Sequence, residues 1–210
     1  MRILAVLVFA LSLSAVAGDI ADARAQGVGA TVTVEGYVSV ASGTFTGFSY
    51  DQGFAIQDDS AGIYVSIAVD PALHLNKYVR VTGTLASSYN QLVLSADIAD
   101  VEVLSGASRV AATEMATGDI NNDSEGTLVA VEGTVTSGPV YDLPYGWKFY
   151  VNDGSGDITV FIASTVSNLD PFDVPWLVVG QKVRVTGMSS EFADHFEINP
   201  RRRGDLTPNH

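Results

Sequence analysis

Two short stretches of the chain alternate apolar and polar side chains in nearly the same way. Residues 77–83 read KYVRVTG and residues 181–187 read QKVRVTG, so valine occupies every second position and a glycine ends each run. A period of two with stiff β-branched side chains predicts a β-strand that buries one face. Because the pattern occurs twice, the sequence predicts two related modules.

Further pairs of segments support the duplication. Residues 32–38 (VTVEGYV) correspond to residues 129–135 (VAVEGTV), with an offset of 131 − 34 = 97 at the shared Val-Glu-Gly. The expected strands are 30–40, 54–57, 63–67, 78–83, 91–94 and 98–104 in the first module, then 128–136, the hairpin 147–162, 182–187 and 196–198 in the second. In the first hairpin the apolar residues at positions 54, 56, 63, 65 and 67 share the inward phase, which leaves Tyr64 on the outer face.

Five short strands per module, with a connection between the third and the fourth, are typical of a small closed Greek-key barrel of the OB type. The alternative is an immunoglobulin-like sandwich, which needs about seven strands and usually a core Trp with a Cys pair, and this chain has no Cys. We therefore predict an all-β fold of two tandem small OB-like β-barrels.

The expected organisation follows from these strands. It comprises a signal peptide over 1–17, a first barrel over 18–104, an acidic linker over 105–126 and a second barrel over 127–210. A short helix over 19–26, with Asp19 as its N-cap, precedes the first strand, and a single helical turn is expected near 113–116.

The same segments resemble a known family. VTVEG, then FAIQDDSAGIYV over 54–65, then VRVTG over 79–83 are similar to the OB-fold modules that accompany secreted bacterial nucleases of the endonuclease/exonuclease/phosphatase type, and EGTLV over 125–129 and FEINPR over 196–201 resemble them too. The resemblance implies nucleic-acid binding. The catalytic domain of those nucleases has no counterpart in this sequence.

The first residues have the three parts of a secretory signal. Met1-Arg2 supplies a positive start, residues 3–16 are almost wholly apolar, and Ala15-Val16-Ala17 fits a small-residue cleavage site. An apolar core of this length is short for a membrane span, which needs about 20 residues. With no Cys there is no lipid-anchor Cys and no disulfide, so we expect a secreted or periplasmic protein without a membrane anchor.

The formal net charge of −13 works against binding to phosphate backbones, so nucleic-acid binding would need a local basic patch. Residues 27–104 carry two Lys and Arg against eight carboxylates, whereas residues 127–210 carry six against ten. The second module is therefore the better candidate for contact with an anion.

OB barrels bind ligands on the outer face of their second and third strands and on the flanking loops, where aromatic rings stack on bases or sugars. Each ring has an alternative role, which is to cover a barrel end or to pack between the modules. We favour Tyr150 beside Lys148. The full set of outward or loop candidates is Phe48, Tyr50, Tyr64, Tyr89, Tyr141, Tyr145, Lys148, Tyr150 and Phe161.

The one basic cluster is Arg201-Arg202-Arg203. It fits a contact with phosphate, for which Arg201 and Arg202 are the candidates, or a solvated tail or bridge to the acidic surface of the other module.

The sequence contains no Gly-x-Ser-x-Gly, His-Glu-x-x-His or phosphate-binding glycine loop, and its three His have no second His or Cys at ligand spacing. We therefore expect no catalysis, no metal and no cofactor. The leading hypothesis is a secreted, non-enzymatic protein that binds single-stranded DNA or RNA or an oligosaccharide. The alternative is an accessory or structural module that docks to another secreted protein and has no nucleic-acid ligand.

Overall fold

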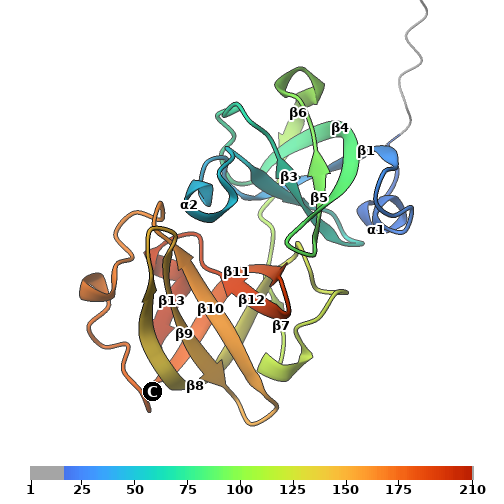
Figure 1. Ribbon diagram of the computed structural model, residues 1–210. Coiled ribbons are helices and arrows are strands. Elements are labelled where there is room, and N and C mark those ends of the chain that lie inside the picture. The colour runs from blue at the N-terminus through green and yellow to red at the C-terminus, as the bar shows by residue number, and fades with distance from the viewer. Residues whose placement is uncertain (1–16, 210) are drawn as a thin grey trace, which may run out of the picture.

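The computed structural model describes residues 17–209, apart from the side chains of Gly47 and Phe48. All of the expected signal peptide except Ala17 lies outside the described residues, as does the candidate ring of Phe48. No helix in the described part of the chain is long and apolar enough to cross a membrane. These residues form two β-barrels that follow one another along the chain (Figure 1).

Five strands close the first barrel in the order β1-β2-β3-β5-β4, because β4 returns to pair with β1. β3 and β5 are parallel, and β6 extends the sheet beyond β4. The elements are α1 (Ile20–Arg24), β1 (Thr31–Val40), α2 (Thr46–Ser49), β2 (Phe54–Gln57), β3 (Gly62–Ser66), β4 (Lys77–Ser88), β5 (Gln91–Ser95), η1 (Ile98–Asp100) and β6 (Val101–Ala107).

The second barrel repeats this order as β8-β9-β10-β12-β11, with β11 returning to β8 and β10 parallel to β12. β7 and β13 add to its two edges. The elements are β7 (Thr113–Glu114), η2 (Thr117–Asp119), β8 (Leu128–Asp142), β9 (Gly146–Asn152), β10 (Asp157–Ala163), η3 (Pro171–Asp173), β11 (Lys182–Phe192), β12 (His195–Asn199), η4 (Arg203–Asp205) and β13 (Leu206–Pro208). Both barrels therefore have the five-stranded Greek-key topology of the OB fold.

The alternation read from the sequence gives the correct faces in the first hairpin. Phe54, Ile56, Ile63, Val65 and Ile67 all lie in the core of the first barrel. Side chains on a strand point alternately to its two faces, so Tyr64 leaves this core on the opposite side. The ring is nevertheless only 3% exposed, because the second barrel covers that outer face.

The short N-terminal helix is present as α1, and Asp19 occupies its N-cap position without accepting a side-chain hydrogen bond. Asp58, from the turn after β2, replaces that cap by accepting a hydrogen bond from the Ile20 amide at 2.8 Å. The expected helical turn near 113–116 is wrong. That segment is strand β7, whose two residues pair with Val129 and Ala130 of β8.

The interface between the barrels is continuous with the core of the second one. From the first barrel, Val40, Phe45, Ala55, Tyr64 and Val93 join the same buried apolar cluster as the second barrel's core side chains. α2 and the β4–β5 hairpin lie at the end of the first barrel that faces the second (Figure 1). The two modules are therefore packed against each other through side chains on the outer faces of their strands.

Polar contacts also join the two modules. The side chain of Arg24 in α1 donates to Glu125 at 2.9 Å, and Glu125 also accepts a hydrogen bond from the Leu92 amide at 3.2 Å. Burial raises the pKa of the Glu125 carboxyl above its ordinary value, against the opposing effect of Arg24. Gln57 of β2 accepts from the Leu128 amide at 2.8 Å at the start of β8.

Two glycines bring the backbones of the modules into direct contact. A Cβ atom on Gly62 would lie 2.5 Å from the carbonyl carbon of Gly126 and 2.8 Å from the amide nitrogen of Thr127. A Cβ atom on Gly126 would in turn lie 2.6 Å from the carbonyl oxygen of Gly62, and Gly126 has a φ of +81°. Neither position has room for a side chain, so the approach of β3 to the start of the second barrel requires both glycines.

We predict that Gly62→Ala lowers the free energy of unfolding by about 1–3 kcal/mol, which is the usual cost of adding a methyl group where the surrounding atoms leave no space for it. Chemical denaturation followed by fluorescence measures this change. Gly204→Ala is the matched control, because a Cβ atom there meets nothing within 4 Å, and its change should stay within about 0.5 kcal/mol. Equal stability of the two variants would show that the backbones are not held this close.

Candidate ligand-binding site

A cavity of about 180 Å³ lies where the two barrels meet. We call it the aromatic cavity, because aromatic rings make up most of its lining. Its residues are Tyr50, Tyr89, Asp142, Tyr145, Lys148, Phe161, Phe192, His195 and Glu197. The first barrel contributes two of these residues and the second contributes seven.

The lining comes from the parts of an OB barrel that bind ligands. Tyr50 lies between β1 and β2, and Tyr89 lies in the turn between β4 and β5. From the second barrel, Tyr145 lies in the β8–β9 turn, while Lys148 and Phe161 are cross-strand partners on β9 and β10. The loops of one barrel therefore face the second-and-third-strand surface of the other.

The β4–β5 turn pairs directly with its counterpart between β11 and β12. The two loops form an isolated β-bridge, and the Ala193 amide donates to the Tyr89 carbonyl at 2.7 Å, while the Asn90 side-chain amide donates to the Ala193 carbonyl. Tyr89 and Ala193 occupy equivalent positions of the repeat, since 193 − 89 and 187 − 83 both equal 104, and both have a positive φ. The Tyr89 ring stacks on Phe192, with ring centres 5.1 Å apart.

On another side of the cavity, Tyr50 meets Tyr145 edge to face, with ring centres 5.9 Å apart. A hydrogen bond with Tyr145 raises the pKa of the Tyr50 phenol above its ordinary value. Tyr50 is 69% exposed and Tyr89 is 64% exposed. Rings with this much free surface can stack on a planar or ring-shaped ligand.

The lining of the cavity contains more carboxylates than Lys and Arg side chains. Lys148 lies 3.4 Å from the Asp142 carboxylate. Glu197 is buried, and its carboxylate lies 3.0 Å from Nε2 of His195. Burial raises the pKa of the Glu197 carboxyl above its ordinary value, although the bond to His195 opposes this.

Two of the predicted rings are not open to a ligand in the way the sequence suggested. Tyr64 is buried between the barrels, and its hydroxyl donates to Asp51 at 2.8 Å. Burial and the Asp51 carboxylate raise the pKa of the Tyr64 phenol. Phe161 is also buried, at 6% exposed, although it contributes to the cavity wall. Both rings follow the alternative role, packing between the modules.

Tyr141 and Tyr150 lie outside the aromatic cavity. Tyr141 is 50% exposed near the end of β8, and Tyr150 is half-buried on β9. Tyr150 shares the outer face of β9 with Lys148, as the sequence suggested, but only Lys148 reaches the cavity wall. Of the favoured pair, Lys148 is therefore part of the candidate site and Tyr150 is not.

Sequence reasoning missed Asp142, Phe192, His195 and Glu197. The repeat itself held a signal for the loop residues, because Phe192 and Ala193 are the counterparts of Ser88 and Tyr89. Aligning the two loops would have marked this turn as equivalent to the one that carries Tyr89. It could not have shown that the two turns pair with each other.

Arg201, the first residue of the basic cluster near the C-terminus, has a structural role. Arg201 is 9% exposed and pairs with the buried Asp205 at 2.9 Å, while its Nη1 donates to the Ser39 carbonyl of β1 at 2.7 Å. Arg202 is 59% exposed and lies 3.4 Å from the same carboxylate. Arg201 therefore bridges to the other module, but through the Ser39 backbone carbonyl rather than through the acidic surface that was expected, and its guanidinium is not free to bind phosphate.

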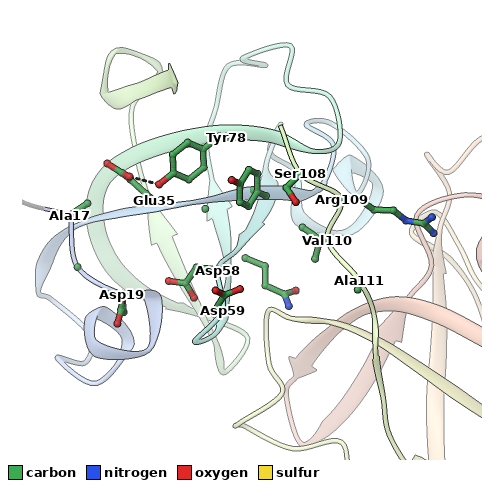
Figure 2. A pocket seen from close by; sticks show the side chains of 14 residues that line it. Ala17, Asp19, Glu35, Asp58, Asp59, Tyr78, Ser108, Arg109, Val110 and Ala111 are labelled. Atoms are coloured by element: carbon green, nitrogen blue, oxygen red, sulfur yellow. Dashed lines mark hydrogen bonds between the residues drawn. The ribbon is translucent and has the colours of Figure 1, made fainter. Parts of the chain in front are cut away.

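A larger cavity of about 610 Å³ lies on the first barrel, on the side of α1 (Figure 2). Two of its four acidic residues already have partners: Glu35 accepts from Tyr78 and Arg80, and Asp58 accepts from the Ile20, Ser60 and Ala61 amides. Arg109 extends away from these carboxylates (Figure 2). One wall is Ala17, next to residues outside the described part of the chain, so this groove supports no assignment.

Over residues 17–209, the structure shows no group of three or more His, Asp or Glu that could hold a metal ion. The region of Asp119 to Asp123, whose spacing partly resembles a calcium loop, instead forms turns closed by its own side chains, as in the bond from the Asp123 amide to Asn121 at 2.8 Å.

No family model matches the sequence, and no curated protein matches it. Solved structures similar to this chain include an OBody bound to hen egg-white lysozyme, with 22% identity over 50% of this chain and 99% of that chain and a TM-score of 0.37. The S. pombe Stn1–Ten1 complex has 15% identity over 40% of this chain and 58% of that chain, with a TM-score of 0.34. A murine DNA-binding protein bound with double-stranded DNA has 10% identity over 85% and 96%, with a TM-score of 0.40. Similarities this low identify no family and no ligand, and the strand pairing alone assigns the fold.

We predict that Arg201→Met lowers the free energy of unfolding by about 3–5 kcal/mol, because it leaves the buried Asp205 carboxylate without its main partner. Arg203→Met is the control, since Arg203 is exposed in η4, and its change should stay within about 0.5 kcal/mol. Urea denaturation of both variants measures the difference. Similar free energies of unfolding for the two variants would indicate that the cluster is a solvated tail rather than a bridge between the modules.

Proposed function

We propose that this protein is a non-enzymatic binding protein in which two OB barrels form one ligand site, the aromatic cavity between them. The ligand is a polymer of ring-bearing units, a single-stranded nucleic acid or an oligosaccharide. One observation carries the proposal: the ligand-binding loops of the first barrel and the ligand-binding face of the second meet around the same set of aromatic rings.

The energetics of stacking support a site of this kind. Stacking of a base on an aromatic side chain contributes about 1–3 kcal/mol per base, so two or three exposed rings can hold a chain even on a weakly charged surface. Tyr50, Tyr89 and Phe192 each keep at least 40% of their surface exposed. The packing of the barrels fixes the loops in advance, which reduces the ordering cost of binding.

A second candidate function is docking to another secreted protein. The observation that favours it is an exposed apolar tip at the end of β8 and in the turn to β9, where Val140, Tyr141 and Leu143 are 45%, 50% and 75% exposed. The acidic balance of the chain also fits a protein partner better than a phosphate backbone. The resemblance to nuclease-associated modules makes a secreted nuclease one such partner.

We further propose that the protein is exported and cleaved after Ala17, which would place it in the periplasm or outside the cell. When the full chain is expressed in a bacterial host, N-terminal sequencing of the protein from the periplasm or medium should begin at Gly18. An unprocessed chain retained in the cytoplasm would contradict the export proposal.

We predict that Tyr89→Ala and Phe192→Ala each weaken ligand binding by about 1–3 kcal/mol, since each removes one stacking surface. The measurement is isothermal titration of the purified protein with an oligothymidylate and with a panel of oligosaccharides. Because Tyr89 is 64% and Phe192 40% exposed and neither belongs to a buried core cluster, the melting temperature should change little.

Tyr141→Ala is the matched control, because the exposed fraction of this ring, 50%, lies between those of Tyr89 and Phe192, but the ring lies outside the cavity. It should leave binding unchanged if the ligand occupies the cavity. A loss of binding in Tyr141→Ala together with normal binding in the two cavity variants would move the site to the β8–β9 tip and favour the docking function.

A further inference from the structure

A second, smaller cavity of about 60 Å³ adjoins the aromatic cavity. We call it the inner cavity. The two share Tyr89, Phe192 and Glu197 in their walls. Whereas rings dominate the outer one, hydroxyl, carboxylate and amide groups line much of the inner one, among them Ser88, Gln91, Ser190 and Glu191.

Gln91 carries an unused donor at this site. The residue is 7% exposed, and its side-chain nitrogen is buried with no hydrogen-bond partner among the described residues. A buried amide without a partner costs about 1–3 kcal/mol, so such groups are rare in folded proteins. Because Gln91 contributes to the cavity wall, an acceptor group bound in the cavity is a candidate partner for this nitrogen.

Several other groups in the wall already have partners or only accept hydrogen bonds. The Ser190 hydroxyl donates to Asn199 at 2.5 Å, and Asp51 accepts from Tyr64 and Ser66. Glu197 is acceptor-only when ionised. A ligand here must accept a hydrogen bond from Gln91 and can donate one to a carboxylate, and a hydroxyl group does both.

The charges of the joined cavities disfavour a phosphate. Lys148 is the only Lys or Arg in either wall, and it faces Asp142 at 3.4 Å. Asp51, Asp142, Glu191 and Glu197 contribute carboxyl groups to the same walls. Phosphate recognition depends on Arg, Lys or a run of backbone amides, and no residue of the Arg cluster lines either cavity.

We propose that the joined cavities hold one ring of an uncharged oligosaccharide, with the ring face on the free face of Tyr89, which Phe192 supports from its other side, and one hydroxyl bonded to the Gln91 side-chain amide. This rests on the proposed function and selects one of its two ligand classes. Rings for the apolar face of the sugar, together with a few convergent polar groups for its hydroxyls, are the usual composition of a small-ligand site.

The test compares wild type with Gln91→Met, which keeps the side-chain length and removes the donor. Isothermal titration uses soluble neutral oligosaccharides (cello-, xylo-, malto- and chito-hexaose) and, in a separate arm, an oligothymidylate. We expect wild type to bind at least one of the sugars and Gln91→Met to bind it at least about tenfold more weakly, equivalent to about 1.4 kcal/mol. The melting temperature of the variant should be equal or higher, because a buried unpaired amide has been removed.

Ser39→Ala is the matched control. The Ser39 hydroxyl is the other buried group without a partner among the described residues, and it lies in neither cavity. This variant should bind the sugar as wild type does. The same sugar affinity in wild type and Gln91→Met would overturn the role of Gln91.

The two proposals fail in different ways. Binding of the oligothymidylate with loss in Tyr89→Ala, and no binding of any sugar, would overturn the oligosaccharide while leaving the aromatic cavity as the ligand site. No binding in either arm would overturn both proposals.

Discussion

The close approach of Gly62 to Gly126 is the constraint on which the rest of the molecule depends. It allows the outer face of β2 and β3 to lie against the second barrel, which buries Tyr64 and Phe161 in one apolar cluster. Burial of two aromatic side chains is a large favourable contribution, of the order of several kcal/mol. The same approach brings the loops of the first barrel to the face of the second, and the aromatic cavity is what remains between them.

Most of the fold could be predicted from the sequence, because the information is local. The alternation of valine and the Gly-rich turns placed the start of each of the ten barrel strands within one residue, and the repeat gave the number of modules. The ends of β4, β8 and β11 were predicted five or six residues too early. Segments without a period of their own were predicted poorly. β7 and β13 are short edge strands that exist only because β8 and β11 offer free hydrogen-bonding groups, so tertiary pairing decides their structure.

The site was harder to predict, because it depends on how the two barrels dock. Alternation correctly placed Tyr64 and Phe161 on the outer faces of their barrels. Those outer faces pack against the other barrel, so both rings are buried in the complete molecule. The role of the basic residues could not be predicted for the same reason. Arg201 belongs to a basic run in the sequence, but in the structure its side chain is buried and bonds to Asp205 and to the Ser39 carbonyl. Glu197 and Gln91 gave no local signal, since a polar residue on a strand ordinarily faces solvent.

The pairing of the β4–β5 turn with the β11–β12 turn has a consequence for stoichiometry. Each copy of the duplicated module has its ligand loop engaged by the equivalent loop of its sibling. Two independent OB modules joined by a flexible linker would bind two ligands and gain avidity from the linkage. If the aromatic cavity is the ligand site, as we propose, the duplication has merged two potential sites into a single composite one. We then expect one ligand per chain, and each half alone would lack part of the site.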